Sequence, residues 1–127
     1  MSKLASNPCS ACQKGAPSVT PEEIEQLMPQ LDPAWRIVEV GGVPRLVRAF
    51  ALKNFVQTME LAARVGELAE AAGHHPALLV EWGQLTVSWW THAILNLHRN
   101  DFIMAAKTDR AFEQLSDTER ETSDGDH

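Results

Sequence analysis

The chain lacks the features of a membrane protein or a nucleic-acid-binding protein. None of its apolar runs approaches the roughly 20 residues that a membrane helix requires. The segment Met1 to Ser6 has no apolar stretch of the kind found in signal peptides, so we expect a cytoplasmic protein. Lysine and arginine number 11 against 17 acidic residues, a net charge of −6, and they form no basic cluster. Because nucleic-acid phosphates bind clustered cations, this charge argues against direct binding to nucleic acid.

Cysteine is also scarce, since Cys9 and Cys12 are the two cysteines of the sequence. A closed zinc site takes four ligands, and no second cysteine pair is present. A thioredoxin-type pair should lie between a strand and a helix, whereas this pair lies in a segment rich in Ser, Pro and Gly. We expect reduced thiols outside the folded domain. A zinc protein built on these cysteines and on histidines is the alternative hypothesis.

Composition and polarity predict one domain with two polar ends. Hydrophobic residues make up 44% of the 127 residues, which is enough for one packed core. We predict a flexible leader over residues 1–19, a folded domain over 20–114 and a disordered acidic tail over 115–127.

The first part of the domain has the pattern of a short helix followed by a hairpin. Thr20 and Glu23 have the spacing of a capping box, and Pro29 should end the helix early. Strands are predicted over 35–40 and 45–50, because β-branched residues alternate there around a Gly-Gly pair.

A long helix is predicted over residues 54–72. Asn54 and Gln57 have capping spacing, and Gly73 can adopt the left-handed conformation that ends a helix. We expect one stripe of apolar and small residues to pack against the sheet: Phe55, Val56, Met59, Ala62, Ala63 and Gly66.

The last part of the domain predicts a second hairpin and a final helix. Strands are expected over 78–82 and 85–90 around a Gly-Gln turn, with Leu85, Val87 and Trp89 on one face. The final helix should run from about Asn100 to Phe112. The predicted fold is therefore α+β, a four-stranded antiparallel sheet with three helices packed on one face, in the order α-β-β-α-β-β-α. An open edge strand of such a sheet favours self-association.

Histidines gather where these elements end. His74 and His75 follow the long helix, His92 follows the last strand, and Asp101 lies in the first turn of the final helix. Imidazoles around one cleft can give and take protons near neutral pH. Taken singly, His74 and His75 could be an exposed helix end without a role, and His92 could be structural. His98, just before the final helix, could be a surface residue. A metal site from Glu70 and these three histidines is an alternative, although no HxH or HExxH spacing occurs.

One set of separated residues resembles the motif of a known family. Its members are Glu70, His74-His75-Pro76, Trp82, Thr91-His92 and Asp101. Their spacing closely resembles the signature of the pterin-4a-carbinolamine dehydratases, and the order of elements over about residues 18–113 is similar too. The stretches 81–92 and 97–102 look like the bacterial branch, whose members accompany phenylalanine hydroxylase. The sequence departs from the animal enzymes at Asn100, where they have arginine, and at Trp90, where they have a small polar residue.

The resemblance implies an enzyme that removes water from 4a-hydroxytetrahydrobiopterin to give quinonoid dihydrobiopterin, with no metal or organic cofactor. It implies that His74 and His92 are the acid/base pair and that His75 holds the substrate. Pro76 would rigidify the turn. Four further residues would line or orient the pocket: Glu70, Trp82, Thr91 and Asp101. A homo-oligomer and a phenylalanine hydroxylase partner are also implied. A non-catalytic binding module, or a regulator of transcription or of the hydroxylase on the same fold, is the alternative.

Overall fold

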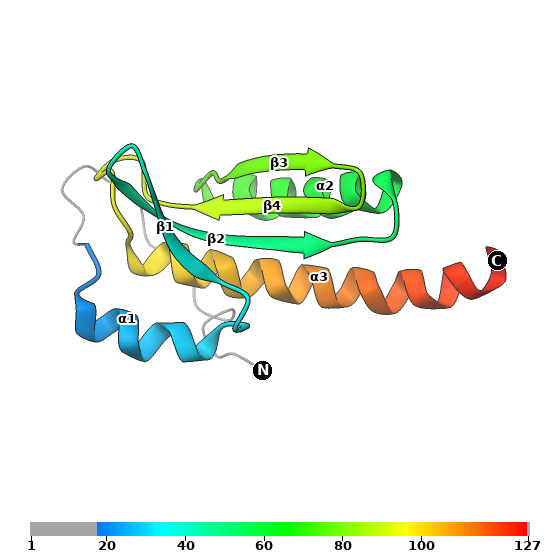
Figure 1. The fold of residues 1–127 in the computed structure, drawn as a ribbon, viewed down its shortest axis with the longest axis horizontal. Coiled ribbons are helices and arrows are strands. Elements are labelled where there is room, and N and C mark those ends of the chain that lie inside the picture. Colours follow the sequence, from blue (N-terminus) through cyan, green and yellow to red (C-terminus); the bar gives the residue numbers. More distant parts are fainter. Residues whose placement is uncertain (1–17, 127) are drawn as a thin grey trace.

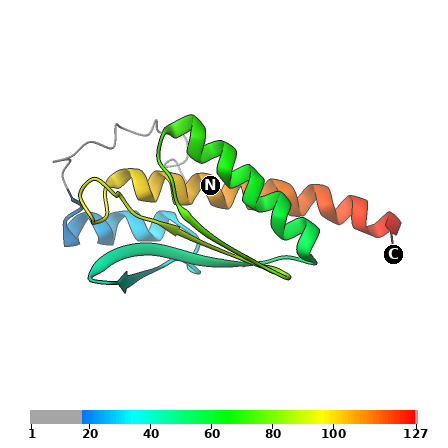
Figure 2. The same cartoon turned by 90° about the horizontal axis from the view of Figure 1, so that it is seen from above.

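One antiparallel sheet of four strands carries the helices on one side (Figures 1 and 2). The computed structural model describes the backbone of residues 18–126 and side chains as far as residue 115. The elements in chain order are α1 (Pro21–Leu27), the 3₁₀ turn η2 (Met28–Gln30), β1 (Arg36–Val40), β2 (Val43–Ala51), α2 (Phe55–Ala72), β3 (Ala77–Glu81), β4 (Gln84–Trp89) and α3 (Arg99–Asp126). The predicted fold class and element order are confirmed.

The sheet has the strand order β1-β2-β4-β3, so both hairpins pair internally and β2 pairs with β4 at the centre. Strands β1 and β3 are therefore the two edges. Within the described residues, no helix is long and apolar enough to cross a membrane. Cys9 and Cys12 lie outside the described residues, as does nearly all of the predicted leader.

The helix starts follow the capping signals in the sequence. The side chains and backbones of Thr20 and Glu23 bond reciprocally at the start of α1. The helix ends early, as predicted, and gives way to η2, which contains Pro29. Asn54 accepts a hydrogen bond from the Gln57 backbone at the start of α2. Gly73 ends α2 with φ of 64°, a conformation that glycine adopts without steric cost.

The predicted packing face of α2 is wrong at the start of the helix, although Ala62 of the same stripe packs against the core. Phe55, Val56 and Met59 are 46%, 71% and 49% exposed, so this end of the predicted stripe faces away from the core. The residues that α2 buries form a neighbouring row, Gln57, Thr58, Leu61, Val65 and Ala69. Leu61 and Val65 are fully buried, because their branched side chains fill space against the sheet that small residues would leave empty.

The core lies between the sheet and the helices. Leu46, Phe50, Leu85, Val87 and Trp89 line the inner sheet face and are at most 1% exposed. From α3, the buried run Phe102 to Ala106 packs against them. The alternation predicted for β4 is thus confirmed.

The helix α3 extends further than the sequence suggested. It continues to Asp126 rather than ending near Phe112. Leu115, which composition placed in the acidic tail, is 1% exposed and belongs to the core cluster. An apolar side chain at this position extends the stripe of α3 by one more turn, and its burial extends the packed part of the helix.

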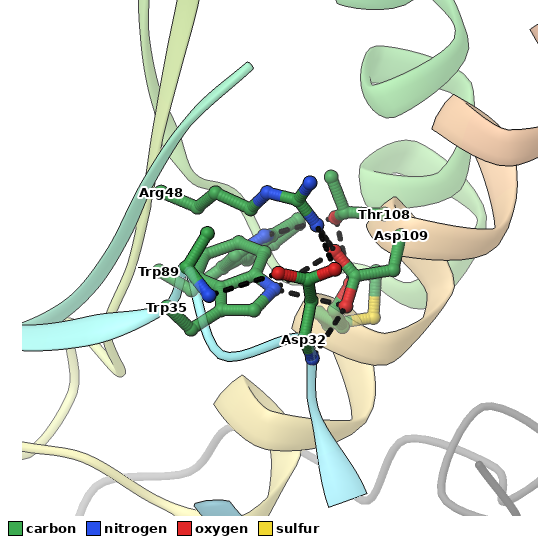
Figure 3. A network of polar contacts seen from close by, with 8 residues as sticks. Asp32, Trp35, Arg48, Trp89, Thr108 and Asp109 are labelled. Carbon is green, nitrogen blue, oxygen red and sulfur yellow. Dashed lines mark hydrogen bonds and ion pairs between the residues drawn. The ribbon is translucent and has the colours of Figure 1, made fainter. Parts of the chain in front are cut away.

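A partly buried polar network ties α3 to the first hairpin and the segment before it (Figure 3). The Trp35 indole donates to both oxygens of Asp109, at 2.8 and 3.0 Å, and Arg48 donates to the same carboxylate at 2.6 Å. The Asp32 backbone N–H completes the set at 3.4 Å. Asp109 thereby joins three parts of the chain that are distant in sequence.

Candidate active site

The end of α2 fixes the position of two histidines. Gly73 ends the helix, and the His74 backbone N–H after it donates to the Ala69 carbonyl at 3.1 Å. His74 is turned inward and is 3% exposed, whereas the side chain of the next residue, His75, is 57% exposed. The tight turn therefore places one imidazole in the protein and the adjacent one at its surface.

His74 is held by a buried carboxylate. Its Nε2 lies 2.6 Å from Oδ1 of Asp101, which is fully buried. A carboxylate accepts hydrogen bonds, so the imidazole N–H donates and the orientation of the ring is fixed. The His74 ring also lies parallel to the indole of Trp89, with centroids 5.7 Å apart and planes within 3°.

Asp101 links this histidine to the start of α3. Its Oδ2 accepts from the Thr91 hydroxyl at 2.9 Å and from the His98 backbone N–H at 2.8 Å. The His98 ring accepts from the Asn100 backbone N–H through Nδ1 at 3.0 Å, so His98 and Asp101 cap α3 reciprocally. One carboxylate thus begins a helix, ties down the end of β4 and orients His74.

His75 has a carboxylate partner at the surface. Its Nε2 lies 2.6 Å from Oε2 of Glu70, one turn earlier on α2. Because the Glu70 side chain is 79% exposed, solvent screens this pair and its contribution to stability is small. Its geometric effect is to hold the His75 ring over the end of α2.

His92 is oriented through a backbone group. Its Nε2 lies 3.2 Å from the carbonyl oxygen of His75, which can only accept a hydrogen bond. The neutral His92 ring therefore carries its proton on Nε2, and the lone pair on Nδ1 remains to accept a proton. This bond joins the segment after β4 to the end of α2.

Two adjacent tryptophans stack on two of these histidines. Trp89 stacks on His74, and Trp90 stacks on His92 with centroids 4.4 Å apart and planes at 21°. Alternation along the chain directs the two indoles to opposite sheet faces. The Trp89 indole N–H donates to the Thr108 hydroxyl at 3.1 Å, which fixes it to α3 (Figure 3).

The histidines share one cavity of about 290 Å³. Its lining is Gly73, His74, His75, His92 and Ala93. Glu70, Thr91 and Asp101 do not line it but hold its histidines by the bonds described above. Pro76 directly precedes β3 and follows the two histidines. The structure thus gathers seven of the eight residues singled out in the sequence.

Trp82 is the residue that the single chain does not bring to this cavity. It lies in the turn between β3 and β4 and is 74% exposed. The whole of β3 separates it from His75, about 20 Å at the usual strand rise. The sequence motif has the right spacing, but an extended strand between His75 and Trp82 carries the two apart.

Other potential binding features differ in chemistry. Among the described residues, no group of three or more His, Cys, Asp or Glu side chains is arranged to hold a metal ion. A larger groove of about 390 Å³ lies between α2 and α3, lined in part by Arg64, Lys107 and Arg110. Its lining contains no imidazole, so the histidine cavity is the better candidate for acid–base chemistry.

Comparison with known proteins identifies the family of the chain. Residues 17–111 match the family described as pterin 4 alpha carbinolamine dehydratase. The chain belongs to this family. It is 58% identical over 112 residues to a provisionally named pterin-4-alpha-carbinolamine dehydratase of Gloeobacter violaceus, covering 88% of this chain and 96% of the relative. A relative of the same provisional name from Syntrophotalea carbinolica is 50% identical, covering 89% of this chain and 100% of the relative.

Two solved structures share the fold. The transcriptional coactivator/pterin dehydratase of Brucella melitensis superposes with a TM-score of 0.67 at 25% identity, covering 75% of this chain and 98% of that one. A pterin dehydratase-like protein identified as a RuBisCO assembly factor in the α-carboxysome has a TM-score of 0.52 at 23% identity, covering 61% of this chain and 88% of that one. At that identity the second likeness concerns the fold alone.

Sequence reasoning missed the aromatic and capping parts of the site. The sequence pattern does not indicate that Trp89 and Trp90 stack on histidines, or that the His98 ring caps α3. The spacing of Trp90 and His92 could have indicated their contact, because residues two apart at the end of a strand lie on the same side. The stacking itself depends on side-chain rotamers that the sequence pattern does not specify.

Proposed function

We propose that this dehydratase-family chain removes water from 4a-hydroxytetrahydrobiopterin to give quinonoid dihydrobiopterin, recycling the pterin of an aromatic amino acid hydroxylase. The observation that supports this most directly is the cavity of about 290 Å³ lined by three imidazoles from two different elements. Family membership gives the class of substrate, and the histidines supply the groups that dehydration needs.

The chemistry requires one proton donor and one proton acceptor. Protonation of the 4a-hydroxyl lets the C4a–O bond break and water leave, while loss of the N5 proton lets the C4a=N5 double bond form. The two proton transfers cancel, so no cofactor is consumed. We assign them to His74 and His92, whose rings each have a fixed hydrogen-bond partner, with His75 holding the pterin.

Decay of the carbinolamine tests the reaction directly. In a phenylalanine hydroxylase reaction, stopped-flow absorbance should show the 4a-carbinolamine disappearing faster when this protein is present. A matched sample with His92→Ala should lose at least about 10-fold of that acceleration. Equal decay with and without the wild-type protein would exclude the proposed reaction.

We also propose a homo-oligomer formed through the edge strand β3. Leu79 on this strand is 57% exposed, and an open edge offers unpaired backbone groups to a second copy. Antiparallel pairing of two β3 strands would carry Trp82 of the second copy toward Pro76 and the histidine cavity. The resemblance that placed Trp82 at the pocket would then be satisfied across two chains.

Light scattering tests this assembly. The wild type should have at least twice the mass of one chain, and Leu79→Lys should shift the population toward the monomer. If the wild type stays monomeric at micromolar concentration, Trp82 of a second copy does not reach the histidine cavity in this way. Contact with the hydroxylase and the cytoplasmic location stay predictions.

A binding module is the second candidate function, and the exposed apolar row of α2 favours it. Phe55, Val56 and Met59 present apolar surface that the chain itself leaves open. A His74→Ala, His92→Ala double variant separates the two functions. A binding role survives in that variant, whereas the dehydratase activity is lost.

A further inference from the structure

His92 is held differently from the other two histidines of the cavity. His74 and His75 each bond to a carboxylate at 2.6 Å. Within the part of the chain whose side chains are described, the His92 ring pairs with no carboxylate and makes one hydrogen bond, at 3.2 Å to a backbone carbonyl. One such bond fixes the direction of Nε2 but leaves the plane of the ring free to turn. Some other contact must therefore fix the plane.

That contact is a stack of three side chains that share the Trp90 indole. The His92 ring lies 4.4 Å from it, and the Arg45 guanidinium carbon lies 3.8 Å from the indole centroid. Strand register explains the arrangement, because Leu46 of β2 pairs with Trp89 of β4 and both are fully buried against the helices. The residues beside them, Arg45 and Trp90, accordingly point to the opposite face of the sheet.

Arg45 is placed for stacking more than for hydrogen bonding. Its Nε is buried and has no hydrogen-bond partner within the described residues. A guanidinium over an indole face is attracted by the negative charge of the ring face and holds the indole in one rotamer. The chain of contacts therefore runs from β2 through Trp90 to His92.

We propose that Trp90 and Arg45 are positioning residues that hold the His92 ring in the plane needed for proton transfer. The proposal rests on the proposed function for its kinetic consequence. His92 needs this support because it is exposed and lies in the irregular segment between β4 and α3, which includes Leu95 with φ of 51°. With Nε2 on the His75 carbonyl and the ring flat on Trp90, Nδ1 keeps one direction toward the substrate.

Removing the aromatic ring is the first test. Trp90→Leu should lower kcat by about 10-fold, because misplacing a proton-transfer group by a fraction of an ångström costs that much. KM should stay within about twofold, since the other cavity contacts remain. Trp90→Phe preserves a stacking face and should recover most of kcat. A Trp90→Leu variant that folds and keeps the wild-type kcat would overturn the proposal.

The position of the ring can be measured without any activity. The ring protons of His92, assigned by their loss in His92→Gln, should resonate upfield of a free histidine because of the Trp90 ring current. The upfield shift should vanish in Trp90→Leu and persist in Trp90→Phe. A wild-type His92 at the free-histidine position would also overturn the proposal.

Arg45→Gln tests the outer part of the stack, with Arg36→Gln as the matched control. Arg36 is an exposed arginine on β1 of the same sheet. Arg45→Gln should reduce kcat by about threefold and weaken the ring-current shift, whereas Arg36→Gln should change neither. Equal effects of the two variants would remove Arg45 from the proposal.

The readouts separate this inference from the proposed function. If the wild type shows the ring-current shift but does not accelerate carbinolamine decay, the stack is present and the proposed reaction fails. If the wild type is active and Trp90→Leu is as active, the reaction stands and the positioning role fails.

Discussion

Helix α3 carries a fully buried aspartate, Asp101, and a partly buried one, Asp109, about two turns apart, and the two bind different kinds of partners. Asp109 binds Arg48 and the Trp35 indole, together with a backbone N–H (Figure 3). Asp101 binds an imidazole, a hydroxyl and a backbone N–H. Each carboxylate gathers three donors. Those of Asp109 all lie far from it in sequence, whereas Asp101 takes one of its three, the His98 N–H, from the start of its own helix. The partners of Asp109 keep their protons at neutral pH, whereas Asp101 orients a group that can exchange one.

The comparison separates a fold-stabilising network from a chemical one. A permanently charged guanidinium beside Asp109 fastens β2 and the segment before β1 to α3 and lies away from the histidine cavity. The imidazole on Asp101 opens onto that cavity. Similar geometry therefore produces stability at one position and a candidate catalytic group at the other, depending on whether the partner is a guanidinium or an imidazole.

The largest expected effect is loss of stability in Asp109→Ala. The change leaves the Arg48 guanidinium and the Trp35 indole without their carboxylate, so the free energy of unfolding should fall by about 3 kcal/mol. Urea unfolding followed by tryptophan fluorescence measures it. The folded fraction should retain its turnover number. A stable but inactive Asp109→Ala would mean that Asp109 serves the chemistry and not the stability of the fold, which would contradict the comparison with Asp101.

The next effect is on catalysis. His74→Ala and His92→Ala should each lower turnover by at least about 10-fold while the fold survives, because each removes one proton-transfer group. Steady-state kinetics of carbinolamine dehydration, with circular dichroism to confirm folding, measures this. If both single variants turn over normally, these two histidines are not the acid/base pair.

The smallest effect is a pH dependence of stability that belongs to Asp109. Burial raises the pKa of its carboxyl above the ordinary value of 3.8, although the Trp35 hydrogen bond and the Arg48 charge lower it. A raised pKa means that the folded state holds the proton more tightly than the unfolded state. Its stabilising contribution is therefore present at low pH and is lost as the pH rises through the raised pKa.

Urea unfolding from pH 3.5 to 7 tests this sign, with Asp109→Asn as the variant that cannot titrate. The wild type should lose stability relative to Asp109→Asn as the pH rises. A relative gain over the same range would mean that the Arg48 pair outweighs burial and that the pKa is lowered.

The sequence predicted the elements of the fold better than their faces. Capping signals at Thr20 and Asn54 and the glycine at position 73 are local, so they predict boundaries well. The stripe of α2 was mistaken because apolar residues occupy two neighbouring rows of this helix. Which row is buried depends on the shape of the sheet surface, and Leu61 and Val65 fit it.

The site was predictable to the extent that it depends on spacing. His74, His75 and His92 could be placed at element ends, and the structure brings them to one cavity. Trp82 could not be placed, because a spacing along the chain does not show that a strand runs away from the site. The tryptophan stacks could not be found either, because they depend on rotamers and on the register between β2 and β4.

The measurement that tests the account most directly is kcat of Asp101→Asn beside Asp109→Asn, at a temperature where both are folded. Asparagine has one carbonyl oxygen where Asp101 uses two oxygens to accept three hydrogen bonds, so the set that fixes the His74 ring cannot be kept intact. We predict that Asp101→Asn loses at least about 10-fold in kcat and that Asp109→Asn stays within about threefold of the wild type. Equal losses in the two variants, or a larger loss in Asp109→Asn, would contradict the account.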